Sequence, residues 1–348
     1  MRRARLERYP KIPATLSELG ALLRDKGGRG LTRTKDGADN IFRGAVGSSA
    51  RKTRSIIFMS KRMRRYLRRA KEIFVDGTWK SRPAKPDSSQ LLSISCLVEG
   101  RIVPLVLVLM QRRTKSAYVK LLETLRDMGL NPDSVHTDFE GPLYESFRTV
   151  FPDIETLGCL IHFVRCLKNK AKKLKLTRFL RRTPLASRIV RCCNALPLLP
   201  ADNIRTGLLT VVRAAKQYGV FRRLKGFLKY VKDVWASKPD VLSVFEEANR
   251  TNNVAESWNR TLRLAVKVKR PNIWIFLDAL VRLEDRTQVD LYMLRRGMTP
   301  RRLRAAKAVS NDSRIKLLTR QLMTDQISMM EFLRFASYRT AGVWNPLM

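Results

Sequence analysis

The chain changes its hydrophobic period at Glu72, and this change constrains its fold more than any other feature of the sequence. Before that point apolar residues recur at helical spacing, as in KRMRRYLRRAKEIF. From Glu72 onward, short apolar runs end in turn-forming or acidic residues, in EIFVDGTWK, QLLSISCLV and RIVPLVLVLM. Runs of this length and composition predict buried strands, and Glu99-Gly100 between the last two predicts a tight hairpin.

Helices and further strands alternate after these three strands. TKSAYVKLLETLRDMGL has the apolar spacing of a helix that ends at Gly129. SVHTDFE predicts a fourth strand, GPLYESFRTVF a second helix, and ETLGCLIHFVRCLKNKAKKLKL a short strand that leads into a long basic helix. Three antiparallel strands followed by alternating helices and strands is the order of the ribonuclease H plan. The predicted fold class is therefore α/β, with a ribonuclease H-like mixed sheet.

Helices are expected in the rest of the chain. Residues 170–250 show only helical periodicity, and a strong helical pattern restarts at NNVAESWNRTLRLAVK. The predicted organisation has five parts: a basic N-terminal helical region and linker (1–70), the first part of the ribonuclease H-like core (71–170), an all-helical insertion (171–250), core-completing helices (251–290) and a C-terminal helical region (291–348).

The charge of the chain indicates the kind of partner it binds. Lys and Arg number 70 against 30 Asp and Glu, a formal net charge of +40, while 44% of the residues are hydrophobic, enough for a buried core. A charge this large repels itself and is tolerated most readily when the partner is a polyanion. Residues 51–71 contain ten basic residues and no acid, and residues 161–230 contain 18 basic residues and Asp202 alone. Double-stranded DNA, contacted through its phosphates, is the expected partner.

Acidic residues gather between the basic segments. Residues 131–160 contain six acids against Arg148 alone. In the ribonuclease H plan the first and fourth strands lie side by side, about 4.8 Å apart, so Asp76 and Asp138 would face each other. Two carboxylates at that distance repel one another, and a pair of bound divalent cations relieves the repulsion. Two Mg²⁺ (or Mn²⁺) ions are predicted, because these cations prefer oxygen ligands.

A third acid is expected to complete this site from a helix. Glu256 lies in NNVAESWNRTL, next to an apolar stripe that includes Trp258 and Leu262. Asp76, Asp138 and Glu256 are therefore the predicted catalytic and metal-binding residues. The residues expected to contact DNA are basic: Lys80, Arg165, Lys168, Lys172, Lys173, Arg260 and Arg263.

Cys159 and His162 are assigned a possible auxiliary role. They lie one helical turn apart. A structural zinc would need two further ligands, for which Cys192 and Cys193 are the candidates, but adjacent cysteines point apart. We therefore expect no structural zinc, and favour a packed cysteine with a hydrogen-bonded histidine near the active site.

His136 is the other possible auxiliary residue. It precedes Asp138 by two positions, so both face the same side of the strand. His136 could approach the scissile phosphate, but a hydrogen-bonded core histidine is the favoured alternative. Trp258 and Trp274 are expected in the core, with base stacking as the alternative.

Five segments in order resemble a known family: VDGTWKSRP, LVEGRIVPLVLVLM, HTDFEGPLYESFRTVFP, GCLIHFVRCL and NNVAESWNRTLR. Together they are similar to the MULE transposase domain, the catalytic domain of Mutator-like DNA transposases. In that family one acid lies in a VDGT-type strand, a second in a D-F-E segment before a C-x-x-H pair, and a third on a helix beyond an all-helical insertion. The matching residues here are Asp76, Asp138, Cys159 with His162, and Glu256.

The resemblance implies a DDE-type transposase that cleaves DNA at transposon ends and transfers strands into target DNA. Such an enzyme must join two ends, so a homo-oligomer is expected. Many relatives carry a zinc-binding DNA-recognition module ahead of this domain, and no such motif is visible here. Two alternatives remain: a domesticated, non-catalytic DNA-binding regulator, and a plain ribonuclease H-like nuclease acting on RNA or hybrids.

The sequence also predicts where the protein acts. MRRARLERYPKIP lacks the apolar stretch of a secretory signal, and the longest apolar run, Ile102–Met110, has nine residues where a membrane span needs about 20. Five cysteines in a chain of this length suggest no disulfide framework, which favours a reducing, intracellular compartment. The KRMRRYLRR run fits either a nuclear import signal or DNA binding. The expected location is the nucleus, and no membrane partner is expected.

Overall fold

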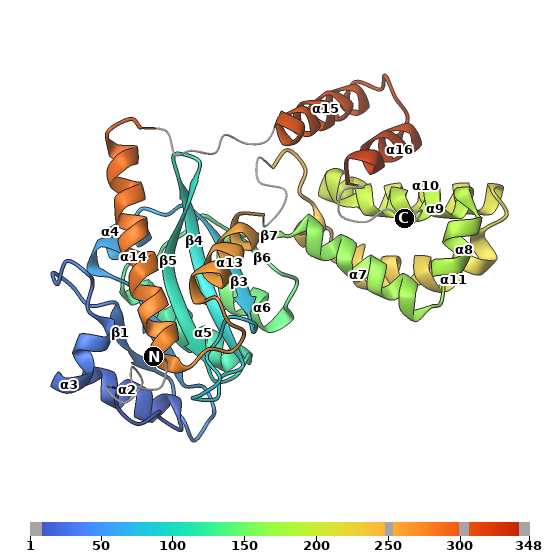
Figure 1. Cartoon of the computed structure of the whole chain (residues 1–348). Helices are drawn as coiled ribbons and strands as arrows, with labels where there is room; N and C mark the ends of the chain where they lie inside the picture. The colour runs from blue at the N-terminus through green and yellow to red at the C-terminus, as the bar shows by residue number, and fades with distance from the viewer. Residues whose placement is uncertain (1–8, 248–252, 299–305, 341–348) are drawn as a thin grey trace. The chain divides into compact units, whose positions relative to one another are not determined.

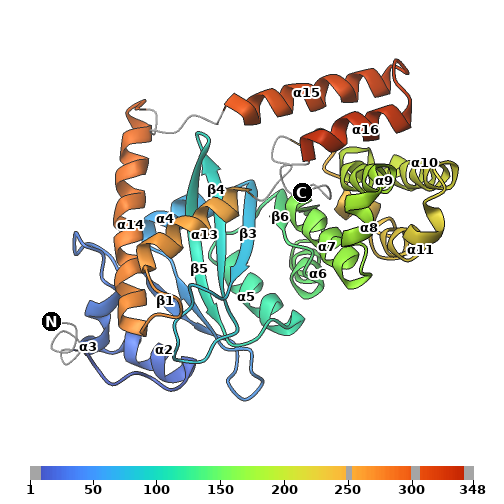
Figure 2. The ribbon, with the colours of Figure 1, turned by 45° about the vertical axis from the view of Figure 1, so that its right-hand side comes forward.

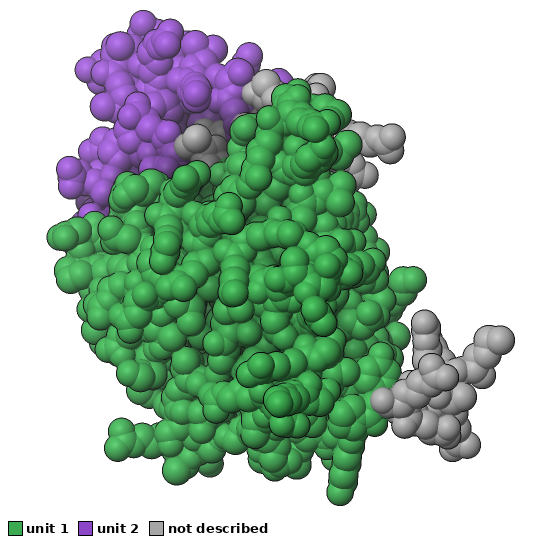
Figure 3. Space-filling model, turned by 90° about the vertical axis from the view of Figure 1, so that its left-hand side faces the viewer, with its two compact units in different colours: residues 1–156, 253–301 green, residues 157–252, 302–348 purple. Residues whose placement is uncertain are grey.

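A computed structural model describes residues 9–247, 253–298 and 306–340, without the side chains of 253–256, 306–309 and 339–340. The chain forms two compact units, distinguished by colour in Figure 3. The first comprises Met1–Thr156 with Asn253–Arg301, and the second Leu157–Asn252 with Arg302–Met348. Each unit is described by itself.

The first unit contains nearly all of a seven-stranded sheet and the helices that cover it (Figure 1). Its strands are β1 (Phe42–Val46), β2 (Ser55–Phe58), β3 (Glu72–Thr78), β4 (Gln90–Val98), β5 (Arg101–Met110) and β6 (Ser134–Thr137), with β7 (Glu155–Gly158) at the unit boundary. Its helices are α2 (Leu16–Arg24), α3 (Lys26–Arg29), the 3₁₀ turn η1 (Gly30–Thr32), α4 (Lys61–Leu67), α5 (Lys115–Asp127), α6 (Gly141–Val150), α13 (Asn253–Val266) and α14 (Ile273–Arg295).

The sheet is mixed, with the strand order β1-β2-β5-β4-β3-β6-β7. Strands β3, β4 and β5 pair antiparallel, and β2 adds antiparallel to β5. Strand β6 instead pairs parallel to β3, with Glu72 opposite Ser134 and Phe74 opposite His136. The predicted α/β class is confirmed, and so is the adjacency of the strands that precede Asp76 and Asp138.

Apolar side chains cover both faces of the sheet. Helices α4, α5 and α6 pack on one face, where alternate residues of β3 such as Ile73 and Val75 meet Tyr118 and Leu122 of α5. Helices α2, α13 and α14 pack on the other face, with Trp258 and Leu262 of α13 among the buried residues. Figure 2 shows α13 lying in front of β3 and β4, in agreement with its contacts to both strands.

Three predicted helices of this unit begin at a residue whose side chain accepts a hydrogen bond from the first turn of the helix. The Thr15 side chain accepts a hydrogen bond from Glu18 N at the start of α2, and Ser60 accepts one from Met63 N at the start of α4. Helix α5 begins in the same way at Thr114 and ends before Gly129, whose φ of +106° suits glycine.

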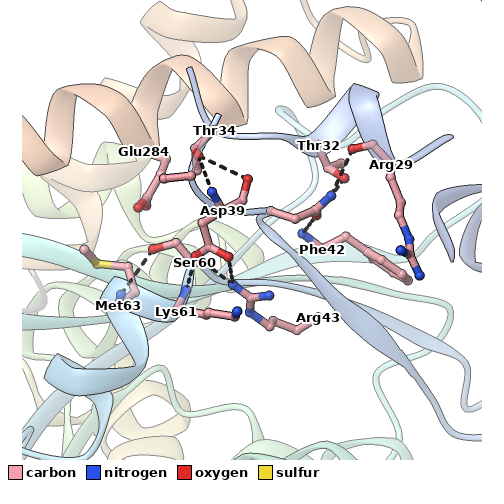
Figure 4. A network of polar contacts seen from close by, with 12 residues as sticks. Arg29, Thr32, Thr34, Asp39, Phe42, Arg43, Ser60, Lys61, Met63 and Glu284 are labelled. Atoms are coloured by element: carbon pink, nitrogen blue, oxygen red, sulfur yellow. Dashed lines mark hydrogen bonds and ion pairs between the residues drawn. The ribbon is translucent and has the colours of Figure 1, made fainter. Parts of the chain in front are cut away.

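The N-terminal region departs from the helical prediction, because β1 and β2 add two strands to the sheet. A network of polar contacts joins the segment that leads into β1 to α4 and α14 (Figure 4). Asp39 accepts two hydrogen bonds from Arg43, each of 2.9 Å, and one from the backbone of Lys61. Burial raises the pKa of Glu284 on α14, although hydrogen bonds from Ser60 and Gln288 oppose this shift.

The second unit is entirely helical outside the end of β7, over the residues that the structure describes. Its helices are α7 (Leu160–Lys173), α8 (Thr177–Arg182), α9 (Pro184–Ala195), η2 (Leu196–Leu198), η3 (Ala201–Asn203), α10 (Ile204–Gln217), α11 (Phe221–Tyr230), the π-helical η4 (Val231–Trp235), α12 (Pro239–Leu242), α15 (Ala306–Met323) and α16 (Met329–Thr340). Phe163 of α7 meets Trp235 edge to face at 5.0 Å, and α16 packs against α9. The helical periodicity predicted for 170–250 is confirmed up to residue 247.

In the described part of the chain, no helix combines the length and apolar character needed to cross a membrane.

Candidate functional site

Asp76 lies in β3, one of the central strands of the sheet. Its side chain is buried, at 7% exposure, and it follows a run of apolar residues in the strand. The neighbouring strand β4 places Ser93 opposite Asp76, and Ser93 Oγ donates a 3.2 Å hydrogen bond to the Asp76 carbonyl. Because strand residues alternate between faces, Asp76 lies on the face away from Ile73 and Val75, which is the face that α13 covers.

Asp138 follows β6 directly and is half-buried. The parallel register pairs Ile73 with Val135 and Phe74 with His136. Continued two residues past the last paired position, this register places Asp76 level with Asp138, with neighbouring strands about 4.8 Å apart. Asp76 therefore lies toward the same end of the sheet as Asp138, which is just beyond the last residue of β6.

Helix α13 is joined to Asp76 by a side-chain contact. Asn259 Nδ2 donates a hydrogen bond to Asp76 Oδ2. Trp258 and Leu262, on either side of Asn259, are buried at 5% and 0% exposure and hold the helix against the sheet.

Glu256 belongs to the same helix, one turn before Asn259. Its side chain lies outside the described residues. Among the described residues, no group of three or more His, Cys, Asp or Glu side chains is arranged to hold a metal ion.

Glu140, a second acid close to Asp138 in the sequence, was not predicted to be a site residue. Glu140 Oε1 accepts a 2.9 Å hydrogen bond from Tyr118 Oη, which in turn accepts one of 2.6 Å from Gln90 Nε2. Arg113 lies 3.6 Å from the other carboxylate oxygen of Glu140. Burial, with the nearby Glu140 carboxylate, raises the pKa of the Tyr118 hydroxyl far above its usual value.

This hydrogen-bonded chain connects the two acid-bearing strands. Gln90 lies so close to Gly77, the residue after Asp76, that a side chain at position 77 would collide with its amide. Glu140 stands two residues after Asp138. The buried chain Gln90–Tyr118–Glu140 therefore fixes the segment after Asp138 relative to the segment after Asp76.

His136 forms contacts within the sheet. Its Nε2 lies 2.7 Å from Glu72 Oε1, and its ring stacks on Phe74 with centroids 4.5 Å apart. At 2% exposure, it has the surroundings of the hydrogen-bonded core histidine that was the favoured alternative. Trp258 and Trp274 are both buried, as predicted.

Cys159 and His162 lie in the second unit, at the start of α7. Cys159 is buried, and His162 is half-buried with its Nε2 3.5 Å from Arg165 Nη1. Cys192 and Cys193 are buried in α9, where burial raises the pKa of Cys192 to about 11 and raises that of Cys193 further. Burial thus opposes the thiolate form of these two cysteines, which is the form that binds zinc.

The predicted DNA-contacting residues divide between the two units. In the first unit Lys80, Arg260 and Arg263 are exposed, the last two on α13. Lys80 follows β3, and its carbonyl accepts a 3.2 Å hydrogen bond from Arg270 N. The other four residues lie on α7 of the second unit, where Lys168 is half-buried and the rest are exposed: Arg165, Lys168, Lys172 and Lys173.

Comparison with known proteins gives one result that bears on this site. Residues 73–166 match the model of the MULE transposase domain, which confirms the resemblance over that range. The matched range includes Asp76, Asp138 and the Cys159–His162 pair, and ends before Glu256. A search of curated proteins found no match.

Proposed function

We propose that this chain is a DDE-type DNA transposase, which cleaves DNA at transposon ends and transfers the cut strand into target DNA. The match to the MULE transposase domain supports a transposase-related function that involves DNA. The single observation on which the proposal depends is the parallel pairing of β3, which carries Asp76, with β6, which Asp138 follows directly.

The strand order supports a ribonuclease H-like core. Numbered along the chain from β3, the strands β5-β4-β3-β6-β7 lie in the order third, second, first, fourth, fifth. The ribonuclease H plan has the same first strand beside the fourth. Strands β1 and β2 would then be an addition at the β5 edge, and the helices of 171–250 an insertion in this core.

The proposed donor set suits two Mg²⁺ or Mn²⁺ ions, with Asp76, Asp138 and Glu256 as their ligands. All three residues supply carboxylate oxygens, the ligands that these cations prefer. Helical periodicity brings position 256 to the side of α13 that carries Asn259, which contacts Asp76. When bound, the ions would activate a water or DNA 3′-hydroxyl for in-line attack and stabilise the leaving oxygen.

The surrounding residues would orient the acids and the DNA. Asn259 donates a hydrogen bond to one oxygen of Asp76 and so orients its carboxylate. The Gln90–Tyr118–Glu140 chain fixes the distance between the two acid-bearing segments. Exposed Lys80, Arg260 and Arg263 would contact the phosphates on either side of the cleaved bond.

Cleavage of matched substrates tests this function. We expect the purified chain to nick duplex DNA that carries the element's own termini in Mg²⁺ or Mn²⁺, and to be inactive in EDTA. RNA–DNA hybrids should be cut more slowly. Faster cutting of hybrids would favour a plain nuclease, and DNA binding without any cutting would favour the domesticated, non-catalytic alternative.

Further proposals follow from the same function. We propose that the core comprises residues 71–170 and 251–290, interrupted by 171–250 and flanked by 1–70 and 291–348. The enzyme would act in the nucleus as a homo-oligomer, since two transposon ends must be joined. Cys159 and His162 would support the core or the position of DNA, without a structural zinc.

A further inference from the structure

A groove between α4 and α14 concentrates arginines that the proposed catalytic site does not use. The groove has a volume of about 380 Å³. Arg62 and Arg65 of α4 line one side, and Gln288, Tyr292 and Arg295 of α14 line the other. Among the residues that the structure describes, none of those lining the groove is acidic. Three guanidinium groups facing one groove, without a lining carboxylate, form a site for an anion.

Two of these arginines are held in place by neighbouring side chains. Arg295 Nη2 donates a 2.7 Å hydrogen bond to Tyr66 Oη, and the guanidinium lies 5.8 Å from the centre of the Tyr66 ring. Arg62 Nη2 lies 2.7 Å from Asp36, which neutralises part of its charge. Arg65 is exposed, and no ion pair to it is found in the described part of the chain. Groups that are already ordered lose less entropy when they bind.

Further basic residues lie on α4 and directly after it. Lys61, Arg64, Arg68 and Arg69 are all exposed, and residues 51–71 contain no acid; Arg64 Nε donates a 3.1 Å hydrogen bond to Met128 O. Cations at this density match a ligand whose negative charges repeat at short intervals, as the phosphates of duplex DNA do.

The groove lies at the opposite end of the sheet from the acid pair. Helix α4 leads into the amino end of β3, whereas Asp76 lies near its carboxyl end. Helix α14 starts close to the carboxyl end, where Ala84 N bonds Pro271 O, and ends beside Tyr66. Asp76 is four residues after Glu72, so along β3 the two places are separated by roughly 13 Å, the length of about four base pairs.

We propose that the α4–α14 groove binds the phosphate backbone of duplex DNA as a second contact, separate from the cleavage site. The proposal rests on the proposed function only for the identity of the polyanion. The groove would contact the DNA several base pairs from the cleaved bond.

The salt dependence of DNA binding tests this proposal. Affinity for a duplex of about 30 base pairs is measured by fluorescence anisotropy at several salt concentrations, in an Asp76→Asn background that keeps the DNA uncut. For the double variant Arg65→Gln/Arg295→Gln, we expect the slope of log K against log salt to fall by about 1.8, since each lost phosphate contact removes about 0.9. Arg65→Gln alone should lower the slope by about half as much.

A control pair with the same change of charge separates the groove from net charge. Arg51→Gln/Lys120→Gln removes two exposed cations from the β1–β2 hairpin and α5. Its slope should stay close to that of the parent. An unchanged slope for the groove variant, or an equal fall for both pairs, would overturn the proposal.

A protein partner is the remaining alternative for this surface, because α4 also fits a nuclear import signal. A groove variant that binds DNA like the parent but loses an import receptor would show that the occupant is a protein, and the proposal would be wrong. All of these measurements use uncut DNA, so absence of cleavage by the wild type would refute the proposed function without affecting them.

Discussion

At the scale of single residues, the contact between Asn259 and Asp76 links the helix and the sheet. An amide donor against one carboxylate oxygen restricts the rotation of the Asp76 side chain. The contact also explains why α13 must lie directly over the acid-bearing end of β3. Partners of this kind, one step away from a metal, commonly change metal affinity or activity by 10- to 100-fold.

Replacing Asn259 by a residue of similar size without a donor tests this role. We predict that Asn259→Leu slows metal-dependent DNA cleavage by roughly tenfold or more and raises the Mg²⁺ concentration needed for half-maximal rate. Ser257→Ala is the matched control, because Ser257 is exposed on the same helix. A wild-type Mg²⁺ dependence in Asn259→Leu would show that Asn259 does not support metal-dependent cleavage.

Glu284 predicts a pH dependence of stability. Burial raises its pKa in the folded state, and the Asp39 carboxylate contributes in the same direction, whereas Ser60, Gln288 and Arg62 act to lower it. The folded protein therefore binds more protons than the unfolded chain, so this group destabilises the fold as pH rises from the unfolded pKa through the folded one.

Glu284→Gln should remove that part of the pH dependence. We expect a higher Tm than wild type at neutral pH and a smaller difference at about pH 4, because the amide cannot ionise. Thermal unfolding followed by circular dichroism over this pH range measures the effect. Glu99→Gln, exposed in the turn between β4 and β5, should shift neither value, and a Glu284→Gln variant that is less stable than wild type at neutral pH would contradict the prediction.

At the scale of elements, β3 and β6 fix the distance between the acids, and the buried chain Gln90–Tyr118–Glu140 reinforces it from α5. Tyr118 is fully buried, so its hydroxyl has no access to water. Removing that hydroxyl takes a hydrogen-bond partner from both Gln90 and Glu140, although Gln90 Nε2 keeps Met110 Sδ at 3.4 Å and Glu140 keeps Arg113 at 3.6 Å.

We therefore predict that Tyr118→Phe lowers the free energy of unfolding by about 1–3 kcal/mol, the cost of unsatisfied buried groups. It should also slow DNA cleavage in conditions where the variant is fully folded. Urea denaturation measures the first effect, and Tyr292→Phe, whose ring is 53% exposed, serves as the control. Equal stability of the two variants would show that the chain does not couple the strands.

The sequence was sufficient to predict β3, β4 and β5, because each is an apolar run with a clear turn signal at its end, and β6 (SVHT) was predicted as a strand that ends at the acid Asp138. The pairing of β3 with β6 followed from the order of the elements. Strands β1 and β2 were missed, since a strongly basic sequence surrounds SIIF and β1 is only half-buried along its length. Only tertiary pairing with β5 makes these residues strands.

The site was predictable where it depends on strand ends, and less so where it depends on side-chain contacts. Asp76 and Asp138 could be paired from the order of the strands. The roles of Asn259 and Glu140 could not, because they require the register of α13 and α5 on the sheet, which no spacing in the sequence specifies. An acid two residues after Asp138 was the only available signal for Glu140.

At the scale of the whole molecule, the net charge of +40 predicts how the proposed binding of DNA depends on salt. Basic residues are exposed on α4 and α13 of the first unit and on α7 of the second. Many phosphate contacts release many counterions, so affinity should depend steeply on salt. We predict that affinity for duplex DNA falls by about 10³-fold or more between 50 and 200 mM salt, as expected for six or more contacts.

A titration of DNA binding against salt checks this prediction. A change of less than about tenfold over the same range would mean that few phosphates are contacted, and that most of the charge serves another purpose. The experiment needs no cleavage and applies equally to the catalytic and the domesticated alternatives.

The most direct test of the central claim is the cleavage of terminal DNA by three single variants: Asp76→Asn, Asp138→Asn and Glu256→Gln. Each replaces a carboxylate by an amide of the same shape, so folding and DNA binding should persist. The account predicts that each variant lowers the Mg²⁺-dependent nicking rate by at least about 10³-fold while its affinity for the DNA stays within about twofold. Nicking at the wild-type rate by any one of the three would contradict it.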